Sequence, residues 1–215
     1  MDQVGAATSA QGTIAPTGVQ VGTGVKAGSV YRVTEQGALT QTGNSYDLAI
    51  SGRGYFKVNL PSGDDAYTRA GNFSINAQGQ IVTEDGYTVS PGITVPAEAT
   101  AVKIDGVGQV QALVPGAAAP QIVGQLELAT FVNPTGLEAM GDNLFRETAA
   151  SGTPTIGAPG STGFGQIQQG FVEASNVNAV TEISNLIIAQ RAYEMNSKVI
   201  SAADDMMSTT AQIAR

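Results

Sequence analysis

The sequence predicts a mainly β protein with a long C-terminal α-helix, an α+β chain whose antiparallel domain of short strands is joined to an extended helix suited to a coiled-coil-like inner sleeve. Two observations predict this class. Short apolar runs alternate with turn residues through the middle of the chain, as in antiparallel β domains. From Ser175 to Arg215 there is neither glycine nor proline, the residues that most often interrupt helices, and Ser175, Asn176 or Asn178 could cap a helix there.

Three regions follow from this pattern. Residues 1–38, rich in Gly, Thr, Gln and Ala, are expected to be an extended segment that packs with the terminal helix region. Residues 39–171 form the predicted antiparallel β domain, and residues 172–215 form the predicted C-terminal assembly helix. Within the β region, the glycines and prolines of residues 152–170 predict a loop or linker that returns from the domain.

The expected strands lie between residues that permit tight reversal, such as Asp85-Gly86 and Asp105-Gly106. The run 125–132 alternates with period two, which is expected to place Leu126, Leu128, Thr130 and Val132 on one face. The other expected strands are Asp47–Ile50, Tyr55–Leu60, Gln80–Thr83, Tyr87–Val89 and Ala101–Ile104.

Composition excludes several classes of function. The net charge is −8 and no basic cluster is present, which argues against a nucleic-acid partner because phosphate binding depends on clustered Lys and Arg. Without Cys or His the chain lacks thiolate chemistry, the commonest general base and the commonest metal ligand. We therefore expect no catalytic residue, no metal site and no cofactor. No apolar run approaches the ~20 residues that span a bilayer, so no membrane insertion is expected.

The predicted helix carries two apolar faces, each with residues spaced alternately by three and four. The faces are offset by two residues, which sets them roughly 160° apart at about 100° per residue, so one partner helix cannot cover both. Asp204 falls on the second face. Either it lies opposite a Lys or Arg of a neighbouring subunit, or it simply interrupts the row of apolar residues. The candidate assembly interface comprises Ile188, Ala192, Met195, Val199, Ala202, Met206 and Ile213 on the first face, and Ile183, Leu186, Tyr193, Ile200 and Met207 on the second.

Length strengthens this expectation. About 35 helical residues span roughly 50 Å, whereas a compact body of ~140 residues is only about 37 Å across. The helix should extend past its own domain and leave more apolar surface than a monomer tolerates. Periodicity alone leaves the alternative that the helix packs across the β domain and that Tyr193 and the methionines are ordinary core.

Nearly the whole chain resembles the bacterial flagellar rod and hook family, and within it the distal-rod members. The resemblance rests on separated motifs in a shared order. They are Asp47-Leu-Ala-Ile-Ser-Gly-Arg-Gly-Tyr-Phe56, Tyr67-Thr-Arg-Ala-Gly-Asn-Phe73, Ile81-Val-Thr-Glu-Asp-Gly-Tyr87, Gln169-Gly-Phe-Val-Glu-Ala-Ser-Asn-Val177 and Ala189-Gln-Arg-Ala-Tyr-Glu-Met-Asn-Ser-Lys-Val-Ile200. The distal-rod likeness adds residues 12–24, 128–137 and 143–148.

The resemblance implies a structural, non-enzymatic subunit of the flagellar basal body that polymerises helically and transmits torque from motor to hook. The implied partners are other copies of the chain, the proximal rod and hook proteins, the envelope ring (bushing) proteins and the flagellar export apparatus. The resemblance also implies that the rod spans the periplasm and that the chain is exported without a cleaved signal peptide. Family members begin with an amphipathic helix and an Asn-rich motif, which we expect this chain to lack. Residues 1–20 are expected to stiffen the rod.

Weaker patterns have simpler explanations. Gly52-Arg-Gly54 lacks the third glycine of a nucleotide fingerprint and predicts a bend with positive φ. The acidic pairs 64–65 and 84–85 adjoin glycines and predict solvated hairpin tips. A different class remains open, a secreted domain that binds carbohydrate or peptidoglycan and uses the helix to oligomerise. Its candidate aromatic residues are Tyr46, Tyr55, Phe56 and Tyr67.

Overall fold

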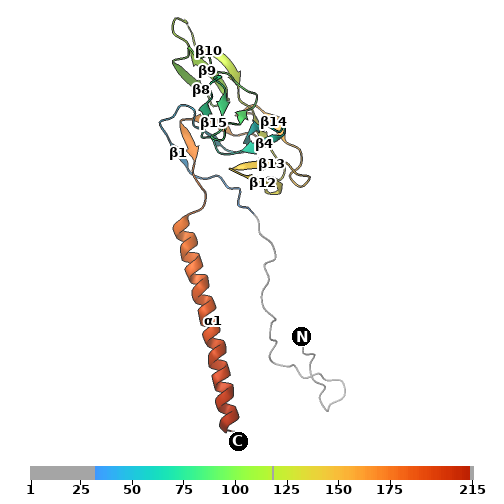
Figure 1. Cartoon of the computed structure of the whole chain (residues 1–215), viewed down its shortest axis with the longest axis vertical. Coiled ribbons are helices and arrows are strands. Elements are labelled where there is room, and N and C mark those ends of the chain that lie inside the picture. Colours follow the sequence, from blue (N-terminus) through green and yellow to red (C-terminus); the bar gives the residue numbers. More distant parts are fainter. Residues whose placement is uncertain (1–31, 118, 214–215) are drawn as a thin grey trace. The chain divides into compact units, whose positions relative to one another are not determined.

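The computed structural model describes residues 32–117 and 119–213, which contain antiparallel strands, one short 3₁₀ turn and one long helix (Figure 1). The chain divides into two units, Met1–Val33 and Thr34–Arg215, and these elements lie in the second. The fold class predicted from the sequence is confirmed. The expected extended segment 1–38 falls largely on residues 1–31, which lie outside the described residues, as do the 12–24 motif and the proposed stiffening segment 1–20.

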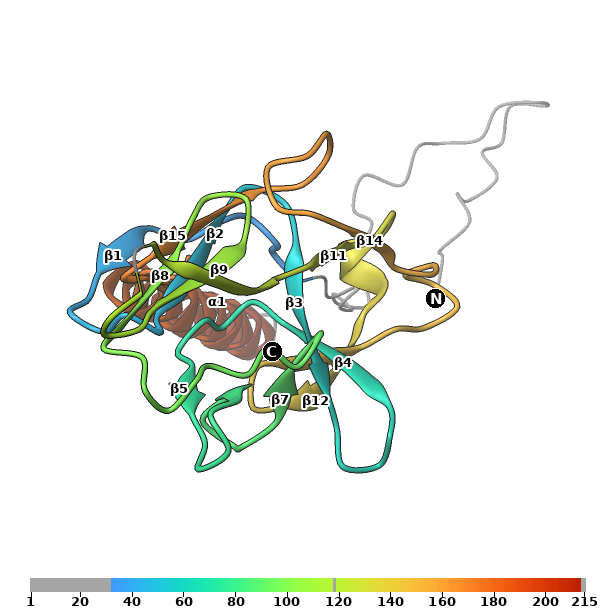
Figure 2. The ribbon, with the colours of Figure 1, turned by 90° about the horizontal axis from the view of Figure 1, so that it is seen from above.

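The main sheet has the order β12-β13-β4-β3-β7-β6-β5, and β11 adds to it by pairing with β3 and with β14. Seen from above, β3 runs through the middle of the domain (Figure 2). The strands of the main sheet are β3 (Tyr55–Asn59), β4 (Asp65–Thr68), β5 (Ser74–Ile75), β6 (Ile81–Val82), β7 (Thr88–Val89), β11 (Leu128–Thr130), β12 (Glu138–Gly141), β13 (Leu144–Arg146) and β14 (Thr155–Gly157).

Three smaller sheets complete the domain, and their strands too are antiparallel. One joins β8 (Ala101–Ile104), β9 (Gln109–Leu113) and β10 (Gln121–Gln125). Another pairs β2 (Leu48–Ser51) with β15 (Gln166–Gln169), and the last pairs β1 (Leu39–Gln41) with β16 (Phe171–Glu173). The remaining elements are the 3₁₀ turn η1 (Pro134–Gly136) and the helix α1 (Ala179–Ile213).

Alternation along the strands builds the core. In β3, Phe56 and Val58 are fully buried while their neighbours are partly exposed, as the period of two requires. These two side chains join a large apolar cluster contributed by strands of the main sheet, β2, β8, β9 and β15. A second, aromatic cluster forms around Tyr67 and Phe131, whose rings meet edge to face at 4.8 Å between centroids.

Two expectations from the sequence are wrong in detail. The stretch 152–170 is not only a loop, because it contains β14 and β15, and β15 pairs with the whole of β2. Its glycines and prolines serve the turns between these strands, while Ile167 is buried in the core. The predicted alternation over 125–132 also does not extend to its end: Leu126 and Leu128 are both buried, but Val132 is 87% exposed because β11 ends at Thr130.

Candidate assembly surface

The helix α1 begins at a side-chain cap. The Asn178 side-chain oxygen accepts hydrogen bonds from the backbone N–H groups of Val180 at 3.0 Å and Thr181 at 3.3 Å. This satisfies two of the donors that a helix N-terminus leaves without partners. Of the three capping residues that the sequence suggests, Asn178 performs this role, while Ser175 and Asn176 lie in the preceding turn. The helix then continues without a break to Ile213, in agreement with the predicted length.

The side chains of α1 are exposed on both predicted apolar faces. The first face includes Met195 at 63% and Val199 at 67% exposure, and the second includes Tyr193 at 78% and Met207 at 74%. The alternative that the helix packs across the β domain is therefore wrong for these side chains. Exposed in the same way are Ile183, Leu186, Ile188, Ala192, Ile200, Ala202 and Met206, whereas the side chain of Ile213 lies outside the description.

Charged residues of α1 are exposed and take part in none of the ion pairs found among residues 32–117 and 119–213. Three of them, Arg191, Lys198 and Asp205, follow one another at intervals of seven and so form one column. Asp204 lies about 100° away from this column, on the second apolar face. The helix thus presents apolar surface with unpaired charges beside it.

The connection between the β domain and α1 is a pair of antiparallel strands. Strand β16, which leads towards the helix, pairs with β1, and beyond it the Ala174 N–H donates to the carbonyl oxygen of Ala38 at 2.8 Å. The Asn176 side-chain amide donates to the carbonyl oxygen of Glu35 at 2.9 Å. Two segments more than a hundred residues apart in sequence therefore run together just before the helix begins.

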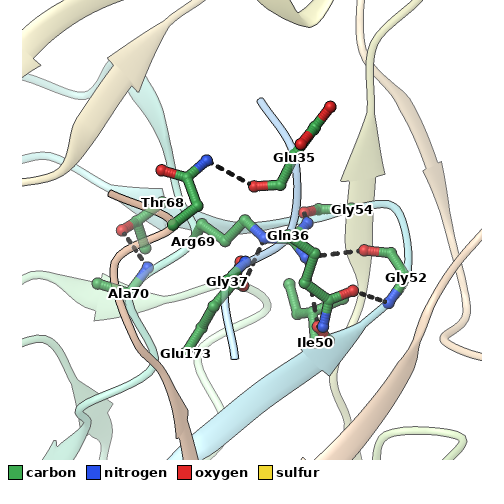
Figure 3. A network of polar contacts seen from close by, with 11 residues as sticks. Glu35, Gln36, Gly37, Ile50, Gly52, Gly54, Thr68, Arg69, Ala70 and Glu173 are labelled. Carbon is green, nitrogen blue, oxygen red and sulfur yellow. Dashed lines mark hydrogen bonds and ion pairs between the residues drawn. The ribbon is translucent and has the colours of Figure 1, made fainter. Parts of the chain in front are cut away.

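Arg69 ties this strand pair to the β domain (Figure 3). Its Nε donates to Glu173 at 2.6 Å, and its two Nη atoms donate to the carbonyl oxygens of Gly54 at 3.0 Å, Gly52 at 2.8 Å and Ile50 at 3.3 Å. The other Glu173 oxygen accepts from the Gly37 N–H at 2.9 Å. One guanidinium thus joins the strand before the helix to the loop after β2, and we call this network the Arg69 junction.

The bend at residues 52–54 supplies the carbonyls of the Arg69 junction. Gly52 and Gly54 have φ of 112° and 145°, which confirms the predicted bend and lets their carbonyl oxygens reach the guanidinium. Gln36 holds the same loop, donating to the Ile50 carbonyl at 3.1 Å and accepting from the Gly52 N–H at 2.9 Å. Gly71 lets the motif 67–73 lie close against the motif 47–56, because a Cβ at position 71 would lie 1.6 Å from the Leu48 carbonyl oxygen.

Sequence reasoning missed the roles of Arg69, Glu173 and Gln169. The Gln169 side chain accepts from the Ile104 N–H at 3.0 Å and donates to the carbonyls of Ser45 at 2.8 Å and Val102 at 2.9 Å, so it binds β15 to β8. The sequence did contain a signal that Arg69 and Glu173 have a role. Both are charged residues with few charged neighbours, and both lie inside the family motifs 67–73 and 169–177. Their pairing could not be read from positions 104 residues apart.

The aromatic residues offered for glycan binding belong to the core instead. Phe56 is fully buried and Tyr67 is 2% exposed, while Tyr55 packs edge to face against Phe131 and Phe145. Tyr46 is partly buried and packs against the large apolar cluster. Burial raises the pKa of Tyr67 to about 12, with smaller contributions from the carboxylates of Glu147 and Asp65. Aromatic stacking on sugars needs exposed rings, so this alternative loses its candidate residues.

Other candidate sites are plain structural features. Asp65 begins β4 and pairs with Lys57 at 2.8 Å, and Glu84 accepts from Asn72 at 2.8 Å. Among the described residues no group of three or more acidic side chains is placed to hold a metal ion. In the same part of the chain, α1 has no stretch apolar enough for a bilayer span. A hollow of about 280 Å³ beside the Arg69 junction is lined by Arg53, Tyr55 and Phe131, among others.

A β domain that carries a long, capped helix with both apolar faces exposed is typical of a structural subunit that assembles with other chains. Residues 49–112 match the family described as flagellar hook protein FlgE/F/G D1 domain, and residues 168–213 match the flagellar basal body rod FlgEFG protein C-terminal family. The second match covers the passage from the end of β15 through α1.

Individual relatives agree with these matches. The flagellar basal-body rod protein FlgG of Caulobacter vibrioides is 62% identical over 213 residues, which cover 99% of this chain and 81% of that protein. FlgG of Agrobacterium fabrum is 47% identical over 204 residues, covering 95% and 78%. The Caulobacter rod protein FlgF is 38% identical over 192 residues, covering 86% and 69%. The chain therefore belongs to the flagellar rod and hook family, in its FlgG basal-body rod branch.

Proposed function

We propose that this chain is a structural subunit of the flagellar distal rod, which polymerises helically as a drive shaft and transmits torque from the motor to the hook. The observation that carries this proposal is a family relationship across 99% of the chain, combined with a terminal helix that is exposed on both apolar faces. Burying one large apolar side chain contributes about 1.5–3 kcal/mol, so apolar contacts along such a helix supply a large favourable term to set against the entropy cost of assembly.

The subunit works by packing rather than by chemistry. Identical subunits in head-to-tail contact form a filament when their rotation does not close a ring. In this proposal the α1 faces make the subunit contacts, and load passes from α1 through β16 into the β domain. The Arg69 junction carries part of that load, because its charge-assisted bonds link Glu173 to the loop after β2.

The same proposal names the specific flagellar proteins that the chain contacts. The rod meets the proximal rod proteins at one end and the hook protein at the other, and it turns inside the envelope rings. Its place is the flagellar basal body, and the export apparatus passes the chain outward without cleavage of a signal peptide. No enzymatic step is assigned to it.

The test is incorporation into the rod. An epitope-tagged chain is produced in a flagellated strain whose own distal rod protein has been deleted, and purified basal bodies are imaged with immunogold. We expect label on the rod and restored motility. Val199→Asp should abolish both, because Val199 is exposed in the subunit and its charge would be buried only in the polymer.

A matched variant separates assembly from folding. Ser201→Asp adds the same charge on the same helix, but between the two apolar faces, and should leave incorporation intact. Rods without label, or equal loss with both variants at equal protein level, would refute the proposal.

A further inference from the structure

Strands β1 and β16 form a ribbon that is fastened to the β domain mainly by polar contacts. We call β1, β16 and the flanking residues 35–38 and 174–176 the β1–β16 ribbon. No side chain of either strand is buried, and among the described residues neither apolar core cluster includes one of them. Apolar burial, the dominant favourable term in folding, therefore contributes little to holding this ribbon in place.

The ribbon is firmly built within itself. The Ala174 N–H donates to the Ala38 carbonyl oxygen at 2.8 Å, and the Asn176 side chain donates to that of Glu35 at 2.9 Å. A Cβ at Gly37 would lie 1.8 Å from the Ala174 carbonyl oxygen, so the two segments are in close contact there. Because these contacts lie inside the ribbon, none of them has to break when it moves as one piece.

One end of the ribbon is continuous with the core strands of the domain. Gly170, which has a φ of 76°, joins β16 to β15, and residues 42–47 join β1 to β2. The Gly170 N–H donates to the Asp47 carbonyl oxygen at 2.7 Å, and the Gly170 carbonyl accepts from the Thr42 N–H at 2.7 Å. Since β2 and β15 are part of the large apolar cluster, this end is anchored and is the point about which the ribbon would turn.

The other end, which leads into α1, is held by the Arg69 junction (Figure 3). Contacts that cross from ribbon to domain there are the pair between Arg69 and Glu173 and the two bonds of the Gln36 side chain to the loop after β2. Each side keeps partners when these contacts break. Arg69 retains three carbonyl oxygens of that loop, and Glu173 retains the Gly37 N–H. Opening this end therefore leaves few polar groups without partners, as in local openings of low free energy.

We propose that the Arg69 junction is a latch with two states. Closed, it holds the ribbon on the β domain, and load passes from α1 into the domain. Open, the ribbon and the base of α1 turn together about the Gly170 end while the β domain stays folded. The open state is expected in about 0.1–10% of the chains. This goes beyond the proposed rod function, because the latch is a property of the single subunit.

Hydrogen exchange in the full chain, followed by NMR, tests the latch. The Gly52 N–H donates to the Gln36 side-chain oxygen across the latch, so it exchanges when the latch opens. The Ala174 N–H lies inside the ribbon and should exchange at least about tenfold more slowly relative to its intrinsic rate. Low concentrations of urea should leave the Gly52 rate unchanged, because opening exposes little surface, and should accelerate the amides of β3, which exchange on global unfolding.

Glu173→Gln is the variant that opens the latch. Its single side-chain oxygen can accept from the ribbon or from Arg69, but not from both. Because a hydrogen bond between charged groups is lost, exchange of the Gly52 N–H should become at least about tenfold faster and stay independent of urea. Glu138→Gln is the matched control, since it makes the same change in an exposed ion pair of the β domain and should leave this rate unchanged.

Three results would overturn the proposal. Equal protection of the Gly52 and Ala174 amides indicates a ribbon that unravels instead of moving as one piece. A Gly52 rate that rises with urea as the β3 amides do shows that no separate opening exists. A Gly52 rate unaffected by Glu173→Gln shows that only the Gln36 side chain moves.

Spin labels measure the motion directly, since the chain has no native cysteine. Labels at Thr40→Cys on the ribbon and Ala77→Cys on the β domain, both exposed positions, report their separation by pulsed EPR. Glu173→Gln combined with Gln36→Ala should give a second distance in about a third or more of the chains, and Glu138→Gln should not. One unchanged distance overturns the proposal. Rods that still assemble in cells after such a result leave the rod function standing.

Discussion

Replacement of Arg69 by Met removes the centre of the Arg69 junction while keeping an unbranched apolar stem. The Glu173 carboxylate, whose side chain is 12% exposed, then loses its 2.6 Å partner and keeps only the Gly37 N–H. Three carbonyl oxygens, those of Ile50, Gly52 and Gly54, lose their donor. Breaking a buried ion pair from one side costs about 3–5 kcal/mol, and partial solvent access to Arg69 lowers this. We expect a loss of about 3 kcal/mol in the free energy of unfolding.

Arg146→Met is the matched control. Arg146 makes a 2.8 Å ion pair with Glu138, but the side chains are 50% and 54% exposed, and exposed pairs contribute little to stability because water and salt screen them. The two variants delete the same residue type from pairs of similar length, so the difference between them measures burial and the additional carbonyl bonds.

Urea unfolding provides the measurement. The chain has no tryptophan, so near-UV circular dichroism reports chiefly the packed Tyr and Phe rings of the β domain, because the aromatic residue of α1, Tyr193, is exposed and lacks a fixed environment. The midpoint should fall for Arg69→Met with an unchanged slope, and should barely move for Arg146→Met. A Glu173→Gln variant completes a double-mutant cycle with an expected coupling above about 1.5 kcal/mol. If Arg69→Met and Arg146→Met differ by less than about 1 kcal/mol, the reasoning about the junction is refuted.

Three further predictions concern packing, capping and pH. Gly71→Ala should destabilise the domain by about 2–4 kcal/mol in urea unfolding, because its Cβ would lie 1.6 Å from a backbone oxygen, whereas Gly43→Ala, with open space around it, should change stability by less than about 0.5 kcal/mol. Asn178→Ala should lower helix stability by about 1 kcal/mol, seen as reduced ellipticity at the helix band, while Asn185→Ala within the same helix should not. The pKa of Tyr67 is raised from about 10 to about 12, so between these pH values the unfolded chain releases a proton that the folded chain keeps, and stability should fall with rising pH by about 2 kcal/mol after allowance for solvent screening. Tyr67→Phe should remove that portion of the pH dependence, and an unchanged slope would contradict the assignment.

The helix could be predicted almost completely, because its determinants are local. A cap residue, freedom from Gly and Pro, and spacing by three and four are all read along one segment, and α1 begins at Ala179 and reaches Ile213 as that pattern indicates. Length and periodicity favoured exposure of its faces, but they left open the alternative that the helix packs across the β domain, and the exposed side chains of α1 decide between the two. The strands were harder to predict, since a two-residue strand such as β5 carries no periodic signal.

What the sequence determined by itself is therefore the class of fold, the capped helix with two apolar faces and, through its motifs, the family. What only the tertiary structure decided is the set of contacts between distant segments: β15 on β2 across more than a hundred residues, the burial of Tyr67, and the four bonds that Arg69 makes to Glu173 and the loop at Gly52. The physical reason is that helix capping and periodicity are satisfied by near neighbours. A guanidinium or a strand edge instead needs partners that the chain supplies only after it has folded back on itself.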